Sequence, residues 1–166
     1  MNSVFLDTNF FLDVIDAKRE RHVRAKEALE YLLSEGVELY TSSDIVATVS
    51  YFLQKKLDLK SAVIHVDVIV RQVEVLVADN ADFVRLNQII LNEIEKNRDL
   101  KIDYEDCMQL FLANKHQVQN ILTSDKKFCT GMVDRFFVNV VELEEVDSTH
   151  KRIPMSNILA SKPESS

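Results

Sequence analysis

The sequence predicts an α/β protein: a three-layer α/β/α sandwich in which helices cover both faces of a central parallel sheet. Short apolar runs typical of buried strands alternate with longer segments whose apolar residues recur every three or four positions, as on an amphipathic helix. Strands that alternate with helices along a chain pair in parallel. Only two glycines and two prolines occur among 166 residues, which is too few for the turns of an all-β protein.

The first part of the chain supplies two strands and a helix. Ser3–Leu6 ends in three apolar residues and is expected to be a buried strand. Arg19–Glu35 has the helical period, and Gly36 ends this helix because glycine adopts the left-handed conformation at little cost. Val37–Thr41 (VELYT) has the composition of a second strand.

The middle of the chain is mainly helical. The sequence SSD at residues 42–44 is a cluster of N-cap residues that opens a helix at Ile45–Lys56. Leu59–Arg71 is expected to be a further helix, and Val73–Val77 (VEVLV) a third strand. Ala81–Lys96 has apolar residues at intervals of three and four, which predicts a long amphipathic helix.

The last part completes the sheet. Tyr104–His116 is expected to be a helix, and Ile121–Thr123 and Val138–Val141 two short strands. Residues 147–166 lose the apolar period and gain Ser, Pro and Lys, as flexible segments do. We therefore expect one domain at residues 1–146 and a flexible C-terminal tail at residues 147–166.

The composition limits the classes of protein. No apolar run approaches the roughly 20 residues of a membrane span, and Asp7 and Asp13 interrupt the first apolar segment, so we expect neither a span nor a signal peptide. Cys107 and Cys129 lack the spacing of a zinc site or a disulfide framework, which favours the reducing cytoplasm. A net charge of −7 opposes indiscriminate binding to nucleic acid but suits an acidic active site.

Carboxylates occur where several of these strands end. Asp7 directly follows the first strand, Asp125 follows Ile121–Thr123, and Asp103 and Asp106 lie three residues apart at a helix start. Ligands of open parallel sheets bind at the carboxyl ends of the strands. Clustered carboxylates repel one another unless cations neutralise them, and oxygen ligands without His or Cys suit Mg²⁺ or Mn²⁺.

Each of these acids also has a structural interpretation. Asp7 and Asp103 are good N-caps, and Asp106 would be a first-turn acid that the helix dipole favours. Asp44, which follows the second strand, has the same alternative, and Asp125 could be a turn residue. The residues alone leave both interpretations open, although the gathering of so many acids at one edge favours a site.

Three motifs together resemble the PIN domain, and in particular the VapC-like toxins of toxin–antitoxin pairs. They are LDTN with Asp13 following, DYEDCMQLFLA, and ILTSDKKF. The resemblance implies a metal-dependent endoribonuclease on an α/β/α sandwich. It implies that Asp7, Asp106 and Asp125 are catalytic and metal-binding residues, that Asp103 is a further metal-binding acid, and that Thr8, Asn9 and Ser124 support them.

The sequence departs from the family pattern at one position. Members usually carry a glutamate inside the helix after the second strand, and Thr48 stands there in this chain. Asp44 lies about one helical turn away and could replace it only in part. A module that binds protein or RNA without cutting it therefore stays open. A phosphatase-like hydrolase with Asp7 as nucleophile is a third possibility, although Asn9 occupies the place of its usual second acid.

The expected partners follow from the resemblance. RNA is the expected substrate, and four lysines near the predicted edge are candidates for contacts with its phosphates. A small basic antitoxin is expected to dock on the helices between Ile45 and Arg71, and the family implies a homodimer without membrane contact. The four lysines are Lys55, Lys56, Lys126 and Lys127.

Overall fold

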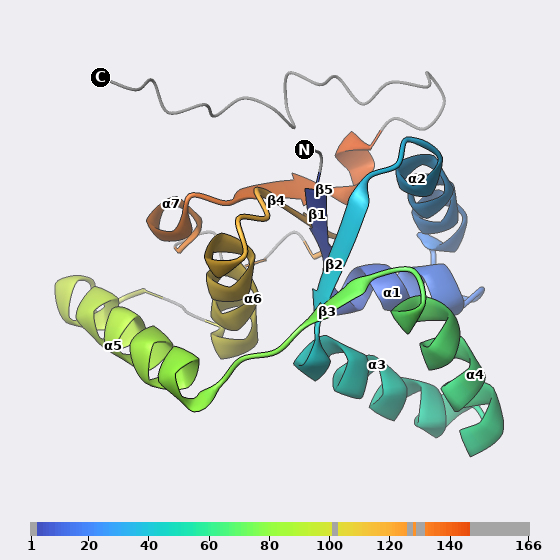
Figure 1. The fold of residues 1–166 in the computed structure, drawn as a ribbon, viewed down its shortest axis with the longest axis horizontal. Helices are drawn as coiled ribbons and strands as arrows, with labels where there is room; N and C mark the ends of the chain where they lie inside the picture. Colours follow the sequence, from blue (N-terminus) through green and yellow to red (C-terminus); the bar gives the residue numbers. More distant parts are fainter. Residues whose placement is uncertain (1–2, 101–102, 126–127, 129–131, 147–166) are drawn as a thin grey trace.

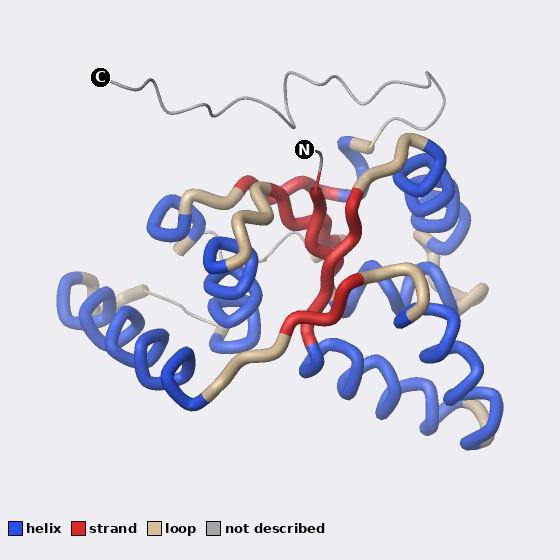
Figure 2. The backbone as a smooth tube through the Cα atoms, viewed as in Figure 1, coloured by secondary structure: helices blue, strands red, loops and turns tan. Residues whose placement is uncertain are grey.

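The computed structural model describes residues 3–100, 103–125, 128 and 132–146. Five strands form one sheet in the order β3-β2-β1-β4-β5, and each neighbouring pair is parallel, which confirms the predicted sheet (Figures 1 and 2). The order reverses between β1 and β4, so the chain builds the sheet outward from β1 in both directions. The strands are β1 Ser3–Leu6, β2 Glu38–Ser42, β3 Glu74–Leu76, β4 Asn120–Thr123 and β5 Asn139–Glu142.

Helices form the two outer layers of the sandwich. Figure 1 shows α1 to α4 on one side of the sheet and α5, α6 and α7 on the other. No helix in the described part of the chain is both long and apolar enough to cross a membrane. The helices are α1 Thr8–Ile15, α2 His22–Ser34, α3 Ser43–Lys56, α4 Leu59–Val70, α5 Asn80–Lys96, α6 Tyr104–Lys115 and α7 Val133–Phe136, followed by a short 3₁₀ helix, η1 Leu143–Glu145.

Most of the expected boundaries agree with the structure to within two residues. The Ser42 side chain caps α3 by accepting a hydrogen bond from the backbone N–H of Ile45 at 3.3 Å. Gly36 has φ +69°, the left-handed conformation expected at the end of α2. α2 begins at His22, three residues later than the sequence predicts, and Arg19 and Arg21 lie in the turn before it.

Two helices have no counterpart in the sequence analysis. α1 buries Phe10 and Phe11, but its eight residues are too few to establish a helical period in the sequence. α7 is a single turn, which is too short for any period. Both helices are defined by the packing of the whole molecule.

The core lies between the sheet and its helices. The apolar residues of β1 are buried, as are Ile121 and Leu122 of β4, which is expected for central strands covered on both faces. α6 is buried along its length from Cys107 to Ala113, so Cys107 is a packing residue as expected. Cys129 and the tail at residues 147–166 lie outside the described residues.

Candidate active site at the carboxyl edge of the sheet

Asp7 follows β1 and caps α1, which confirms its interpretation as an N-cap, while its role as a site residue stays a prediction. Its backbone N–H donates to the carbonyl of Leu122 in β4, which extends the sheet by one bond. Its side chain caps α1 by accepting from the backbone N–H of Thr8. The same carboxylate accepts from Thr123 Oγ1 at 2.7 Å and from Gln109 Nε2 at 3.1 Å. A carboxylate held by three elements is fixed in position.

Burial changes the charge balance of Asp7. The side chain is almost completely buried, and this burial raises the pKa of its carboxyl group. The hydrogen bonds from Thr123, Gln109 and the backbone oppose the rise by favouring the ionised form. The ionised carboxylate is therefore held in place but poorly solvated, which is a state that a cation stabilises.

The other acids reach the same edge from two further elements. Asp103 caps α6 by accepting from the backbone N–H groups of Glu105 at 2.9 Å and of Asp106 at 3.3 Å. Asp125 follows β4, and its backbone N–H donates to Thr123 Oγ1 at 2.9 Å. The Thr123 hydroxyl therefore connects Asp7 to the backbone of Asp125.

These acids line one pocket of about 480 Å³. Thr8, Asn9, Thr48 and Lys56 line it as well, so the structure brings together most of the residues that the sequence singled out. The catalytic and metal-binding roles of these residues stay predictions. The acids in the pocket are Asp7, Asp16, Asp103, Glu105, Asp106 and Asp125.

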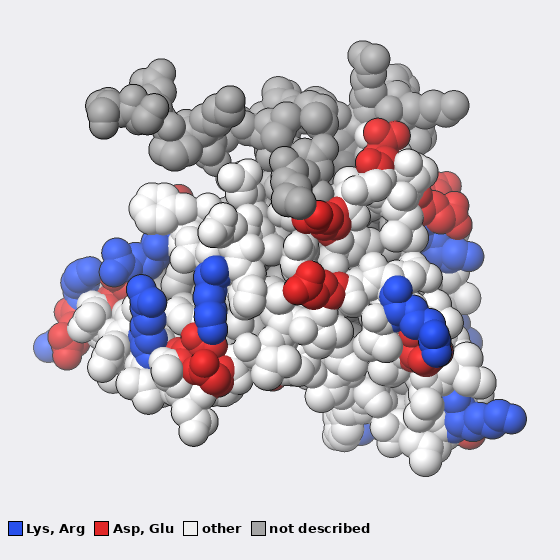
Figure 3. Space-filling view, viewed as in Figure 1, with Lys and Arg blue, Asp and Glu red and all other residues white. Residues whose placement is uncertain are grey.

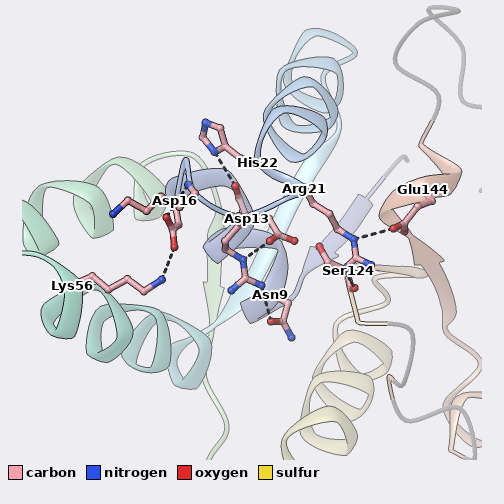
Figure 4. A network of polar contacts seen from close by, with 10 residues as sticks. Asn9, Asp13, Asp16, Arg21, His22, Lys56, Ser124 and Glu144 are labelled. Carbon is pink, nitrogen blue, oxygen red and sulfur yellow. Dashed lines mark hydrogen bonds and ion pairs between the residues drawn. The ribbon is translucent and has the colours of Figure 1, made fainter.

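Other residues from the sequence analysis are not part of the pocket lining. Ser124 is buried, and its carbonyl accepts from Arg21 Nη1 at 2.6 Å, a contact that ties the end of β4 to the turn before α2 (Figure 4). Lys55 lies over the ring of Tyr51, 4.2 Å from its centroid. Asp44 is exposed in the first turn of α3. Lys126 and Lys127 lie outside the described residues.

Glu105 is an acid of the pocket lining that the sequence analysis did not single out. It accepts from Thr8 Oγ1 at 3.2 Å. Burial is the main cause that raises the pKa of its carboxyl group, and the charges of Asp7, Asp103 and Asp44 raise it further. Its pattern gave no signal, because it stands between two family positions in DYEDC. Gln109 and Thr123 were missed for a related reason: both read as ordinary residues of a helix and a strand.

The donor set suits a hard divalent cation in its chemistry, since every acidic group in the pocket offers oxygen. Within the described residues, no three His, Cys, Asp or Glu side chains stand close enough together to form a metal site by themselves. Mg²⁺ keeps several of its waters and is commonly bound through one or two carboxylates plus substrate phosphates. The pocket therefore fits a hydrated ion held by few carboxylates, and not a cage built from protein ligands alone.

The fold is that of an α/β protein with a five-stranded parallel sheet, and its candidate site is an acidic pocket at the carboxyl edge of that sheet. The PIN domain family model matches residues 4–130. This match covers most of the chain, and the chain belongs to the PIN domain family.

Relatives narrow the branch of the family. The chain is 33% identical over 130 residues to a curated protein of Aquifex aeolicus named Ribonuclease VapC1, covering 77% of this chain and 86% of that one. Two solved structures share the fold. One is VapBC-1 of nontypeable Haemophilus influenzae (TM-score 0.64, 14% identity, 86% of this chain and 98% of that one). The other is VapC20 of Mycobacterium tuberculosis, described as a sarcin-ricin loop cleaving toxin (TM-score 0.59, 18% identity, 77% and 94%).

Proposed function

We propose that this chain is a metal-dependent endoribonuclease that hydrolyses RNA phosphodiester bonds. The observation that supports this most is the meeting of six carboxylates from three separate segments in one pocket. The 33% identity to a protein named a ribonuclease points to the same chemistry. Nucleases of this family act with divalent metal ions, and Mg²⁺ or Mn²⁺ suits the oxygen donors here.

In this proposal the acids divide the work. Asp7, Asp106 and Asp125, with Asp103, would hold the metal directly or through water. When bound, such an ion would supply activation of a water molecule and stabilisation of charge on the phosphoryl group. Gln109 and Thr123 keep the Asp7 carboxylate in place, since both donate hydrogen bonds to it.

Glu105 supplies the carboxylate that Thr48 lacks. Both residues line the pocket, although they come from different helices. Thr8 holds Glu105 through its hydroxyl group, so the acid lost from α3 is replaced from α6. A non-cutting module is the competing proposal, and Thr48 together with the lack of a ready-made three-acid group in the described residues speaks for it.

A cleavage assay distinguishes the ribonuclease from the non-cutting module. The purified chain should cut a structured RNA in Mg²⁺ or Mn²⁺ and should leave it intact in EDTA. Asp7→Asn and Asp106→Asn should lower the rate by at least about a hundredfold, because each removes a carboxylate that would hold the metal ion. Asp67→Asn, on an exposed part of α4, is the control and should cut normally. Equal cutting by wild type and Asp7→Asn would assign the activity to a contaminant.

The relatives also suggest the partner. Several similar structures are of VapBC complexes, in which a VapC protein is present with VapB. We propose that this chain is a toxin in the reducing cytoplasm, where its RNA substrate lies, and that a small antitoxin silences it. A basic side chain of the antitoxin would pair with the pocket carboxylates.

The docking surface is a groove of about 370 Å³ between α1, α2 and α4. Ile64 and Val68 line it and are about half exposed. The expected surface between Ile45 and Arg71 is thereby restricted to its second half, because Ile45, Val49 and Leu53 are buried in the core. α1 contributes side chains to both the groove and the acidic pocket, so one segment of a partner can reach both.

A matched pair of variants on α4 tests this surface. Ile64→Lys should abolish co-purification with the product of the neighbouring gene, because it places a charge in the apolar groove. Val63→Lys should not, since Val63 is equally exposed but does not line the groove. Loss of binding in both variants, or in neither, would remove the groove from the proposal.

A homodimer is also part of the proposal. Val84 and Leu91 of α5 are more than half exposed and give this helix an apolar face. Light scattering should report twice the mass of one chain, and Leu91→Glu should return it to a monomer.

A further inference from the structure

The acidic pocket also contains two cations. Arg19 and Lys56 line the same cavity as Asp7 and its neighbouring acids. On the face shown in Figure 3, Lys and Arg side chains are divided between the two sides of the molecule and form no continuous basic surface. Since the chain carries a net charge of −7, the few cations inside the pocket matter for any polyanion that enters it.

Arg19 is fixed by contacts to α1. Its Nε donates to Asp13 Oδ1, and its Nη2 lies 3.4 Å from Asn9 Oδ1. Nη1 takes part in neither of these contacts, and a third of the side chain is exposed. Because Asn9 and Asp13 lie on α1, whose N-cap is Asp7, the guanidinium is anchored to the helix that begins at the acidic site.

Holding Arg19 through Asp13 costs free energy, because the Asp13 carboxylate is buried. Its side chain is 3% exposed, and within the described residues its Oδ2 has no hydrogen-bond partner. Burying a carboxylate costs free energy, and replacing both members of such an ion pair by well-packed apolar residues is often neutral or stabilising. The pair is therefore explained better by what it positions than by the stability it gives.

A phosphate is the group that this guanidinium suits. Arginine presents a planar fork of donors that matches phosphate geometry, whereas lysine is a flexible point charge. Lys56 pairs with Asp16 and is more exposed, so it is less well fixed. Several carboxylates repel the anionic phosphodiester that enters the pocket. A cationic side chain near the phosphodiester would offset this repulsion in addition to the charge of a metal ion.

We propose that Arg19 binds a phosphate group of the RNA in the acidic pocket and that Asp13 and Asn9 are positioning residues for it. This inference rests on the proposed ribonuclease function. It adds a substrate-binding residue that the family motifs in this sequence did not indicate.

Binding is measured apart from cutting in the Asp7→Asn background. The probe is a fluorescein-labelled RNA hairpin, followed by anisotropy in Mg²⁺ at several salt concentrations. Arg19→Met should weaken binding roughly tenfold to a hundredfold, the range of one charge-assisted hydrogen-bond pair. It should also reduce the slope of log affinity against log salt by about one. Arg19→Lys should fall between wild type and Arg19→Met.

Arg71→Met is the matched control. Arg71 pairs through Nε with Asp67 on α4, as Arg19 does with Asp13, but lies outside the pocket lining. Its removal should change neither the affinity nor the salt slope.

A second variant guards against a folding defect, because Arg19→Met leaves the buried Asp13 carboxylate without its cation. Asp13→Asn/Arg19→Met removes both charges and should keep the wild-type melting temperature to within a few degrees while binding RNA as weakly as Arg19→Met. Unchanged affinity and salt slope in this folded double variant would overturn the inference. If the protein with Asp7 intact does not cut RNA, but Arg19→Met still weakens RNA binding, the result would support the phosphate-binding role of Arg19 and overturn the ribonuclease proposal. RNA binding by none of the proteins would overturn both.

Discussion

Burial of the Asp7 carboxylate determines how the pocket responds to pH and to metal ions. Its pKa is raised in the folded protein because the ionised form is poorly solvated, although four hydrogen bonds oppose the rise. Folding therefore favours the protonated form of this group. Without metal, the contribution of Asp7 to stability is fully present below its unfolded pKa of about 3.8 and is lost as the pH rises through the raised value.

This sign gives a prediction for Asp7→Asn. In EDTA, wild type should lose stability relative to Asp7→Asn as the pH rises from about 4, because only wild type must ionise a buried group. Denaturant unfolding at a series of pH values measures the difference. A constant difference between the two proteins from pH 4 to pH 8 would contradict the account.

Thr48 offers a gain-of-function test at the residue scale. Thr48→Glu adds a carboxylate to the pocket lining, so it should lower stability in EDTA and raise it in millimolar Mg²⁺. A tenfold gain in metal affinity corresponds to about 1.4 kcal/mol at saturating metal. Thr48→Gln has the same shape without the charge and should respond to metal as wild type does. Melting temperatures that ignore metal in all three proteins would argue against a metal site.

At the scale of elements, Asp103 combines a cap with a charge, and two substitutions separate them. Asp103 caps α6 through the N–H groups of Glu105 and Asp106. Asp103→Ala removes the cap and should cost about 1 kcal/mol of stability with or without metal. Asp103→Asn keeps the cap, so it should preserve stability in EDTA but reduce the stabilisation by Mg²⁺.

Melting curves in EDTA and Mg²⁺ measure both effects. If Asp103→Asn responds to Mg²⁺ as wild type does, then Asp103 is a cap only, and the metal-binding role implied by the family resemblance does not hold for it.

The elements that could be predicted are those whose pattern is local. The strand ends at Asp7 and Asp125 follow from short apolar runs, and the parallel pairing follows from the alternation of strands and helices. α1 could not be predicted, because eight residues are too few to establish an amphipathic period. Glu105, Gln109 and Arg19 could not be found either: their place in the pocket depends on how helices from distant segments pack together.

At the scale of the whole molecule, we expect the protein to be toxic to the cell that expresses it. Expression of the chain alone should arrest growth, because RNA cutting in the cytoplasm stops protein synthesis. The variant Asp7→Asn/Asp106→Asn should be harmless, and co-expression of the neighbouring gene should restore growth to wild type. A harmless wild-type protein that binds no small partner and leaves RNA intact would favour the non-cutting module.

The most direct test of the central claim, that the pocket carboxylates hold a divalent cation, is anomalous diffraction from crystals grown in millimolar Mn²⁺. The account predicts a manganese peak in the pocket, about 2.0–2.6 Å from an oxygen of Asp7, Asp106 or Asp125 and completed by waters. The peak should be lost in Asp7→Asn/Asp106→Asn crystals. Well-ordered wild-type crystals whose pocket contains no manganese at that concentration would contradict it.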